Sequence, residues 1–127
     1  LLCLPLPDAI VPMPLPLPRL RQRGYNQAQE LALATGLPLG VPVRPDLLLR
    51  PSCDTPQSHL RAKERRRNLH GSFAASPSAA GLRLWLLDDI VTTGSTARAA
   101  ARTLLLAGAQ RVDLVALART SLHPAER

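Results

Sequence analysis

The chain has 127 residues, 46% of them hydrophobic, which is enough for one domain with a buried core. A formal net charge of +7 favours an anionic partner, which could be nucleic acid, an acidic membrane surface or a phosphorylated small molecule. Cys3 and Cys53 stand alone without a C-x-x-C pair, which argues against a disulfide framework or a cysteine zinc site and favours a reducing cytoplasmic compartment.

The first 18 residues are apolar but lack the pattern of a signal peptide. They have no basic start, they contain Asp8, and six prolines would break the helix that such a segment needs. No other stretch reaches the roughly 18 uninterrupted apolar residues of a membrane span. We therefore expect a soluble protein with no membrane partner. The absence of an initiator methionine leads us to expect that the chain begins inside a longer gene product.

In chain order, the first expected elements are a short strand and a helix. Ala9–Val11 is an apolar run that ends at a proline, which predicts a short buried strand. A helix is expected from Asn26, its N-cap, to about Thr35, with Gly36 just past its end. Its expected inward-facing residues are Ala28, Leu31, Ala32 and Ala34.

The middle of the chain carries weaker signals. Residues 46–50 predict a second strand and residues 71–74 a short one. Between them, residues 51–70 are polar, basic and without periodicity, which is long for a connection in a compact domain and typical of a functional loop or of disorder.

The last third of the chain alternates strand and helix. Residues 82–87 form a nearly continuous apolar run that includes Trp85, the pattern of a strand covered on both faces. Residues 95–107 predict a helix closed by Gly108, and residues 112–118 predict a final strand. This alternation indicates an α/β fold with a parallel twisted sheet flanked by helices.

The stretch LWLLDDIVTTGST, residues 84–96, carries the clearest chemical signal. In a parallel sheet, ligands bind at the carboxyl ends of the strands, where helix N-termini present free N–H groups and partial positive charge. Asp88 and Asp89 are expected at that edge, followed by a turn suited to a phosphate. The turn consists of Thr92, Thr93, Gly94, Ser95 and Thr96. A ribose 5-phosphate, with two vicinal hydroxyls and one phosphate, would satisfy both the acids and the turn.

Three other interpretations of this stretch fit its residues less well. A Walker-type ATPase requires G-x-x-x-x-G-K-[ST] upstream, which the chain does not contain. A phosphoacceptor receiver domain has its acids early in the chain and no TTGST turn. In a purely structural interpretation, the two acids cap a helix and the turn is ordinary. The coincidence of strand, acids and hydroxyl-rich turn within thirteen residues favours a phosphate site.

The same stretch resembles the phosphoribosyl pyrophosphate (PRPP) motif of type I phosphoribosyltransferases, and further motifs resemble the ComF-like competence family. These motifs cover nearly the whole chain. They are Val11-Pro12-Met13-Pro14, Arg19-Leu20-Arg21-Gln22-Arg23-Gly24-Tyr25-Asn26-Gln27, Thr55-Pro56-Gln57, Glu64-Arg65, Asn68 and Gly71-Ser72-Phe73. The resemblance implies a type I phosphoribosyltransferase-like core in a protein linked to DNA uptake.

The resemblance also implies roles for individual residues. Asp88 and Asp89 would be the catalytic acids that hold the ribose hydroxyls, and residues 92–96 would hold the 5′-phosphate. Arg19 and Arg23 would bind the pyrophosphate. Residues 51–70 would form a lid, with Thr55, Gln57, Arg65 and Asn68 as its site residues. Mg²⁺ would be bound through PRPP oxygens and by no protein ligand directly.

Two departures from the family pattern affect these expectations. Residues 16–18, Pro-Leu-Pro, stand where the family more often has a histidine and a basic residue, which predicts a stiffer pyrophosphate loop with weaker donors. The chain also lacks the Cys-rich zinc module with which the family commonly begins, and it has no recognisable hood over the core. We therefore expect residues 1–127 to be one domain, shortened at its amino end, whose acceptor the sequence does not disclose.

Two functions from different classes remain open. The first is a Mg²⁺-dependent phosphoribosyltransferase, a glycosyltransferase that displaces pyrophosphate from PRPP. The second is a non-catalytic module of the competence machinery that senses PRPP or a nucleotide or binds DNA. The second basic cluster, residues 61–67, leaves single-stranded or duplex DNA and competence proteins as open partners. Three aromatic residues are too few for a base-stacking platform, but phosphate contacts do not require one.

Overall fold

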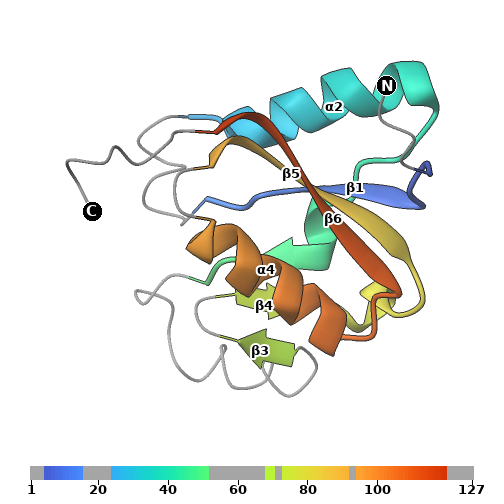
Figure 1. Cartoon of the computed structure of the whole chain (residues 1–127), viewed down its shortest axis with the longest axis vertical. Helices are drawn as coiled ribbons and strands as arrows, with labels where there is room; N and C mark the ends of the chain where they lie inside the picture. The colour runs from blue at the N-terminus through green and yellow to red at the C-terminus, as the bar shows by residue number, and fades with distance from the viewer. Residues whose placement is uncertain (1–4, 16–23, 52–67, 71–72, 92–93, 120–127) are drawn as a thin grey trace.

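The computed structural model describes residues 5–15, 24–51, 68–70, 73–91 and 94–119 (Figure 1). Within these ranges the chain folds into an α/β arrangement of strands and helices. They are β1 (Ala9–Pro12), α2 (Gln27–Leu39), β2 (Leu48–Leu49), β3 (Asn68–His70), β4 (Phe73–Ala75), β5 (Arg83–Val91), α4 (Ser95–Leu106) and β6 (Arg111–Arg119). Short 3₁₀ turns cover Pro45–Leu47 and Pro77–Ala79.

The main sheet is parallel, in the strand order β1-β5-β6. Strand β5 is central because its apolar run can be buried on both faces. An isolated parallel bridge between Ile10 and Val43 extends the sheet beyond β1. The predicted parallel α/β fold is therefore confirmed. A second, antiparallel sheet of order β2-β4-β3 was not predicted from the sequence.

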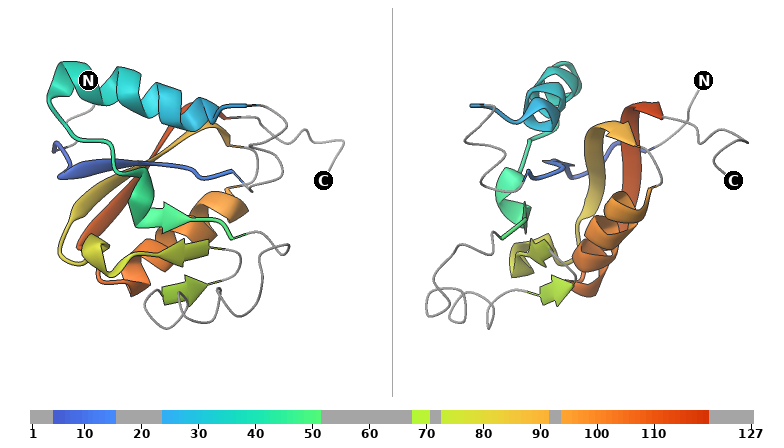
Figure 2. Two further views of the ribbon diagram at one scale, coloured as in Figure 1. Left: turned by 180° about the vertical axis from the view of Figure 1, so that it is seen from behind. Right: turned by 90° about the vertical axis from the view of Figure 1, so that its left-hand side faces the viewer.

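Alternating side chains of β1 and β5 divide the core between two faces of the parallel sheet. On one face, Ala9, Val11, Leu84 and Leu86 pack with α4 and with the small sheet. On the other face, Ile10 and Leu87 pack with Ala32 and Val41, next to the partly buried Trp85. Helix α2 thus covers one face, and α4 with the small sheet covers the other (Figure 2).

Helix α2 is longer than the sequence predicts. The expected end near Thr35 is wrong, because the helix continues through Gly36 and Pro38 and is closed by Gly40 in the left-handed conformation (φ 69°). A Cβ on Gly36 would lie 2.6 Å from the carbonyl oxygen of Val41. Close packing of the helix against the chain that follows it therefore outweighs the low helix propensity of glycine.

The inward face of α2 also differs in one residue from the prediction. Ala28, Ala32 and Gly36 are buried at intervals of four residues, whereas Ala34 is exposed. Two residues correspond to about 200° around a helix, so Ala34 lies opposite Ala32.

The predicted strand over residues 46–50 is only partly correct. Pro45 starts a 3₁₀ turn, which is supported by an ion pair of 2.9 Å between Arg44 and Asp46. Strand pairing begins only at Leu48. The short strand expected over residues 71–74 is β4, which begins at Phe73.

The bounds of helix α4 and strand β6 agree closely with those predicted from the sequence. Helix α4 buries Ala97, Ala100 and Leu104 at helical spacing, and the buried Thr103 hydroxyl donates to the Ala99 carbonyl at 2.7 Å. Gly108, with φ 106°, follows the helix. Neither helix in the described part of the chain is long and apolar enough to cross a membrane.

Candidate functional site

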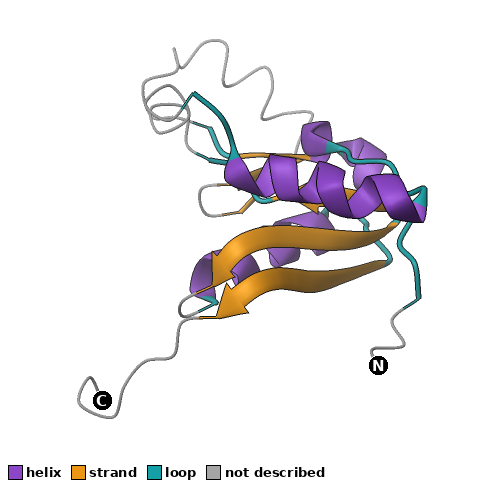
Figure 3. Ribbon diagram, turned by 90° about the horizontal axis from the view of Figure 1, so that it is seen from above, coloured by secondary structure: helices purple, strands orange, loops and turns teal. Residues whose placement is uncertain are grey.

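One edge of the parallel sheet collects the carboxyl ends of β1, β5 and β6. Helices α2 and α4 both begin at this edge, as the parallel strand directions require when helices connect strands. Figure 1 shows the starts of both helices beside these strand ends, and in Figure 3 the arrowheads of the parallel strands β5 and β6 lie at the end where α2 begins. This is the part of an α/β sheet where ligands generally bind.

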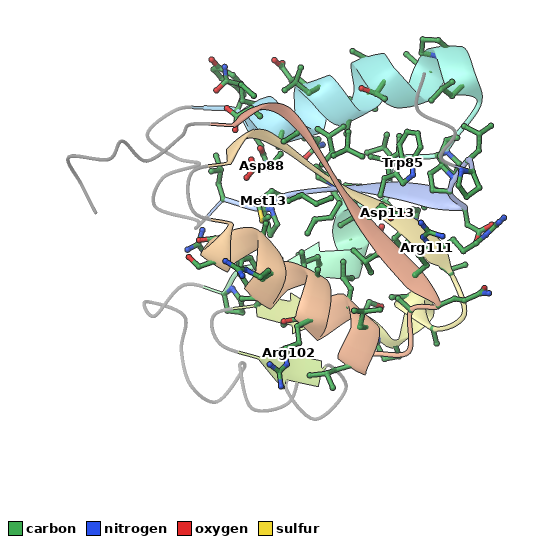
Figure 4. The ribbon with its side chains drawn as sticks, viewed as in Figure 1. Met13, Trp85, Asp88, Arg102, Arg111 and Asp113 are labelled. Atoms are coloured by element: carbon green, nitrogen blue, oxygen red, sulfur yellow. The ribbon has the colours of Figure 1, made fainter. Side chains whose placement is uncertain are left out.

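The acidic pair lies inside β5 and not after it. The strand was predicted over residues 82–87, but it runs to Val91 because its pairing with β6 continues through Ile90↔Ala118 and Val91↔Arg119. Both acids are therefore held by the sheet backbone near its carboxyl edge. Figure 4 shows Asp88 at this end, away from Trp85 and Asp113.

Asp88 and Asp89 interact with each other. The backbone N–H of Asp89 donates to Oδ1 of Asp88 at 2.9 Å. Burial, followed by the hydrogen bond to the Asp89 side chain, raises the pKa of Asp88 to about 6. Both side chains are half-buried. The pair thus provides neighbouring oxygens that can accept hydrogen bonds from hydroxyl groups.

Helix α4 begins at the predicted phosphate turn. Gly94 occupies the N-cap position in the left-handed conformation (φ 82°), which glycine adopts without strain. Gly94 has no side chain to cap the first turn, and Ser95 and Thr96 are exposed there. The backbone N–H groups of this turn and two hydroxyl-bearing residues therefore lie a few residues after the acidic pair.

Asn26 connects the start of α2 to the end of β1. Its Oδ1 accepts from the backbone N–H of Ala28 at 3.0 Å, which confirms the predicted N-cap. Its Nδ2 donates to the carbonyl oxygen of Met13 at 3.1 Å. The backbone N–H of Met13 in turn donates to the carbonyl oxygen of Leu87 at 2.8 Å. Asn26 is thus linked to the residue that directly precedes Asp88.

Part of the predicted site lies outside the described residues. The structure brings Asp88, Asp89, Gly94, Ser95 and Thr96 to one edge of the sheet. Asn68 is the first residue of β3, and its side chain is not described. The predicted site residues that lie outside the described ranges are Arg19, Arg23, Thr55, Gln57, Arg65, Thr92 and Thr93. Most of the 51–70 segment, predicted as a lid, also lies outside them.

Two features near these elements were not predicted from the sequence. Asn26 was expected as a helix cap and as part of a family motif, but its 13-residue separation from Met13 gives no periodic signal for their hydrogen bond. Arg50, whose guanidinium lies 5.2 Å from the centre of the Phe73 ring, was not expected to make this contact. Such a cation–π contact holds the cation on one side of the small sheet.

The described residues fit a magnesium ion that arrives with its ligand. Mg²⁺ prefers oxygen ligands and usually keeps waters or phosphate oxygens in its shell. Asp88 and Asp89 supply carboxylate oxygens, and the described ranges contain no group of three or more His, Cys, Asp or Glu that could hold a metal ion. Because Mg²⁺ is octahedral, two carboxylates would leave most of its shell to water or to the oxygens of a bound ligand.

Comparison with known proteins adds sequence relatives and a shared fold. No protein-family model matches the chain. It is 39% identical over 117 residues to DNA utilization protein YhgH of Salmonella typhi and 36% identical over 119 residues to competence protein F of Haemophilus influenzae. These alignments cover 92% and 91% of this chain. The resemblance to the ComF-like competence family is confirmed. The chain spans about half the length of these relatives, 52% in each case.

A solved structure supports the fold of this ComF-like chain. The glutamine PRPP amidotransferase of B. subtilis, in complex with ADP and GMP, superimposes with a TM-score of 0.59 at 18% identity. The match covers 89% of this chain and 23% of the amidotransferase. The fold is therefore of the type I phosphoribosyltransferase kind, and the residues predicted to bind PRPP remain a prediction.

Proposed function

We propose that this ComF-like chain binds PRPP together with Mg²⁺ and transfers its phosphoribosyl group to an acceptor, in a protein that serves DNA utilisation. The observation that carries the proposal is the position of Asp88 and Asp89 on the strand that precedes the start of α4, where Gly94 is the N-cap, at the carboxyl edge of a parallel sheet. The names of the relatives, DNA utilization protein and competence protein F, support the cellular role.

Each half of the ligand has a counterpart in the described residues. The ribose 2′- and 3′-hydroxyls would donate to the carboxylates of Asp88 and Asp89, which are fixed by β5. The 5′-phosphate would accept from backbone N–H groups and hydroxyls at Gly94, Ser95 and Thr96. This arrangement would hold the ribose at both ends and leave its anomeric carbon for the acceptor.

The acidic pair also suits the chemistry of transfer. Loss of pyrophosphate leaves positive charge on the ribose ring, and nearby carboxylates stabilise such charge when they are already in place. Mg²⁺, when bound with PRPP, would neutralise the departing pyrophosphate. With a pKa of about 6, Asp88 would be mainly ionised at pH 7 and so able to stabilise the positive charge on the ribose ring.

A second function, from a different class, is a module that senses PRPP or a nucleotide without turnover. The observation that favours it is the wording of the relatives' names, which concern DNA utilisation and competence and mention no transfer reaction. Both functions use the same edge of the parallel sheet. Release of pyrophosphate from PRPP in the presence of candidate bases and amines would separate them, because only the transferase produces it.

Calorimetry of Mg²⁺-PRPP binding tests the role of the acidic pair. We expect Asp89→Asn to weaken binding by about 1 to 3 kcal/mol, because a charged acceptor of ribose hydroxyls is lost. Asp113→Asn is the matched control. Asp113 lies on the neighbouring strand β6 and pairs with Arg111 at 2.9 Å, toward the opposite end of the sheet (Figure 4). Unchanged affinity in a folded Asp89→Asn protein would remove the pair from the site.

A further inference from the structure

The charged side chains of the described residues are unevenly distributed over the surface. Three arginines in or beside the parallel sheet form ion pairs. These pairs are Arg44 with Asp46 at 2.9 Å, Arg83 with Asp8 at 3.6 Å and Arg111 with Asp113 at 2.9 Å. Each pair combines both signs of charge, so it attracts an external anion only weakly.

Helix α4 and the small sheet form a side of the molecule whose sequence contains no acids. The helix packs against the small sheet, because Ala97 and Leu104 share a buried cluster with Phe73 (Figure 1). The segments that contain these elements include no aspartate or glutamate, and they are residues 47–51, 68–82 and 94–110. Arginines on this side therefore have no carboxylate within these segments to compensate their charge.

Arg98 and Arg102, here called the α4 stripe, lie along the outer side of the helix. Both residues are exposed. They are four residues apart, which places them on the same side of the helix, about 6 Å apart along its axis. Figure 4 shows Arg102 beside β3, away from the ion pair of Arg111 and Asp113. The stripe thus presents two neighbouring cations to solvent.

The α4 stripe opposes the charge arrangement that stabilises a helix. Acids are favourable in the first turn and cations in the last turn, but α4 has no acid in its first turn and no basic residue in its last turn. Arg98 instead lies near the helix start, where its Nε donates to the Gly94 carbonyl oxygen at 3.4 Å. Like charges four residues apart also repel each other. Helix stability therefore does not account for the two arginines, whereas an external anion would offset both effects.

We propose that the α4 stripe is a contact surface for the phosphate backbone of DNA. Its two arginines provide separate cations for neighbouring phosphates, and Ser95 and Thr96 add exposed hydroxyl-bearing residues at one end. Such contacts do not depend on base sequence. This inference goes beyond the proposed function, since it assigns a second anionic partner to α4 and does not require PRPP binding.

An anionic membrane surface is the competing partner for such a stripe, because Leu105 and Leu106 are also exposed. A helix that lies on a membrane inserts a continuous apolar face. The apolar face of α4 is instead buried in the core through Ala97, Ala100 and Leu104. Two exposed leucines at one end do not replace it. The role in DNA utilisation proposed above also favours DNA.

Three double variants test the location of the contact. In the stripe variant, Arg98→Gln and Arg102→Gln remove both charges, and in the lysine variant, Arg98→Lys and Arg102→Lys keep them. The matched control combines Arg44→Gln and Arg111→Gln, which lower the net charge equally at side chains that are 41% and 52% exposed. Fluorescence anisotropy measures the affinity of each protein for two short duplexes of unrelated sequence, at several salt concentrations.

We expect the stripe variant to bind both duplexes at least about tenfold more weakly than wild type. The slope of its logarithmic salt dependence should be smaller by about 2, because about one counterion is released per phosphate contact. The lysine variant and the control should stay within about threefold of wild type, since backbone phosphates require a charge at the right place. The urea midpoint should be unchanged in the stripe variant, because both side chains are exposed.

Several results would overturn this inference. They are a wild-type chain that does not bind DNA at low salt, equal losses in the stripe variant and the control, and an unaffected stripe variant. A lysine variant as weak as the stripe variant would also overturn it, because charge would then not be the property that matters. Tighter binding to phosphatidylserine vesicles than to DNA, lost in the stripe variant, would assign the stripe to a membrane surface.

Two further measurements keep the test decisive. If the stripe variant unfolds, Arg102→Gln alone replaces it and should bind DNA about threefold to tenfold more weakly; wild-type affinity in that protein would overturn the inference. Calorimetry with Mg²⁺-PRPP separates this inference from the proposed function. A chain that binds DNA through the stripe but does not bind Mg²⁺-PRPP would overturn the proposed function and leave this inference standing.

Discussion

At the scale of single residues, the position of Asp88 in β5 gives its carboxyl group a raised pKa. Consecutive side chains of a strand normally point to opposite faces. The Asp88 carboxylate nevertheless accepts from the backbone N–H of Asp89 at the strand's carboxyl end. Burial penalises the charged form of Asp88, and the hydrogen bond to the Asp89 side chain raises its pKa further. The raised pKa of Asp88 is therefore a consequence of its position in β5.

This pKa predicts a pH dependence of stability. Because the pKa of folded Asp88, about 6, lies above its unfolded value of 3.8, its contribution to stability is complete below pH 3.8 and is lost as the pH rises through about 6. Asp88→Asn stays neutral, so the variant should gain stability relative to wild type between about pH 4 and pH 7. We expect a gain of about 1 kcal/mol, less than full linkage gives, since solvent screens a half-buried carboxylate.

Urea unfolding of both proteins at several pH values measures this difference. The Asp8 carboxyl, whose pKa is lowered chiefly by its hydrogen bond with the Arg83 backbone, has the opposite pH dependence. It is present in both proteins, so its effect cancels in the comparison. A stability difference between variant and wild type that does not change with pH would contradict the assignment of a raised pKa to Asp88.

At the scale of elements, α2 contains Gly36, a residue of low helix propensity, at a point of close packing. A Cβ at Gly36 would approach the Val41 carbonyl oxygen to 2.6 Å and a Val43 methyl group to 3.3 Å. Alanine favours helices over glycine by about 1 kcal/mol, but overpacking costs about 1 to 3 kcal/mol. We expect Gly36→Ala to destabilise the fold by about 1 to 2 kcal/mol, as measured by urea unfolding.

The neighbouring residue provides a control for this prediction. Leu37 is 79% exposed in the same helical turn, so Leu37→Ala should change the unfolding free energy by less than about 0.5 kcal/mol. A Gly36→Ala protein at least as stable as wild type would show that α2 can move away from Val41 at little cost.

The start of α4 gives a second prediction at this scale. A residue other than glycine in the left-handed conformation costs about 1 to 2 kcal/mol, and asparagine tolerates that conformation better than β-branched residues do. Gly94→Val should therefore lose stability, whereas Gly94→Asn should lose less. Both should lose ribose 5-phosphate affinity, because each side chain would occupy the space that a phosphate needs.

Urea unfolding measures the loss of stability, and calorimetry with ribose 5-phosphate measures the loss of affinity. Retained affinity in Gly94→Asn would mean that the turn serves only the fold and that the phosphate does not approach Gly94.

At the scale of the whole molecule, the net charge of +7 predicts weak, salt-dependent binding to DNA. The affinity for a short duplex, measured by fluorescence anisotropy, should fall by at least about tenfold between 50 and 200 mM salt because counterions are released. Mg²⁺-PRPP binding should fall less over the same range, since fewer charges are paired. DNA affinity that is insensitive to salt would contradict a purely electrostatic contact and favour the DNA-binding alternative.

The sequence predicts the parallel sheet well because its signals are local. The apolar runs at β1, β5 and β6 and the cap at Asn26 each depend on neighbouring residues. Features that depend on distant residues were missed. The continuation of α2 past Gly36 requires the approach of Val41, and the small antiparallel sheet requires pairings between short segments far apart in the chain.

The candidate site likewise combines features that depend on neighbouring residues with features that depend on distant ones. The acidic pair and the glycine turn can be recognised from thirteen consecutive residues, whereas the link from Asn26 through Met13 to Leu87 cannot. That link joins three segments, and no residue spacing indicates it. Sequence motifs thus predict which groups are present, and the fold determines which of them share an edge.

PRPP is proposed to bind at the carboxyl edge of the parallel sheet. An NMR titration of the ¹⁵N-labelled chain with Mg²⁺-PRPP tests it directly, because amide shifts report both affinity and location. We predict saturable shifts at Asp88, Asp89, Gly94, Ser95 and Thr96, with Arg111 and Asp113 at the far end unchanged. Absence of saturable shifts, or shifts confined to residues away from this edge, would contradict the account.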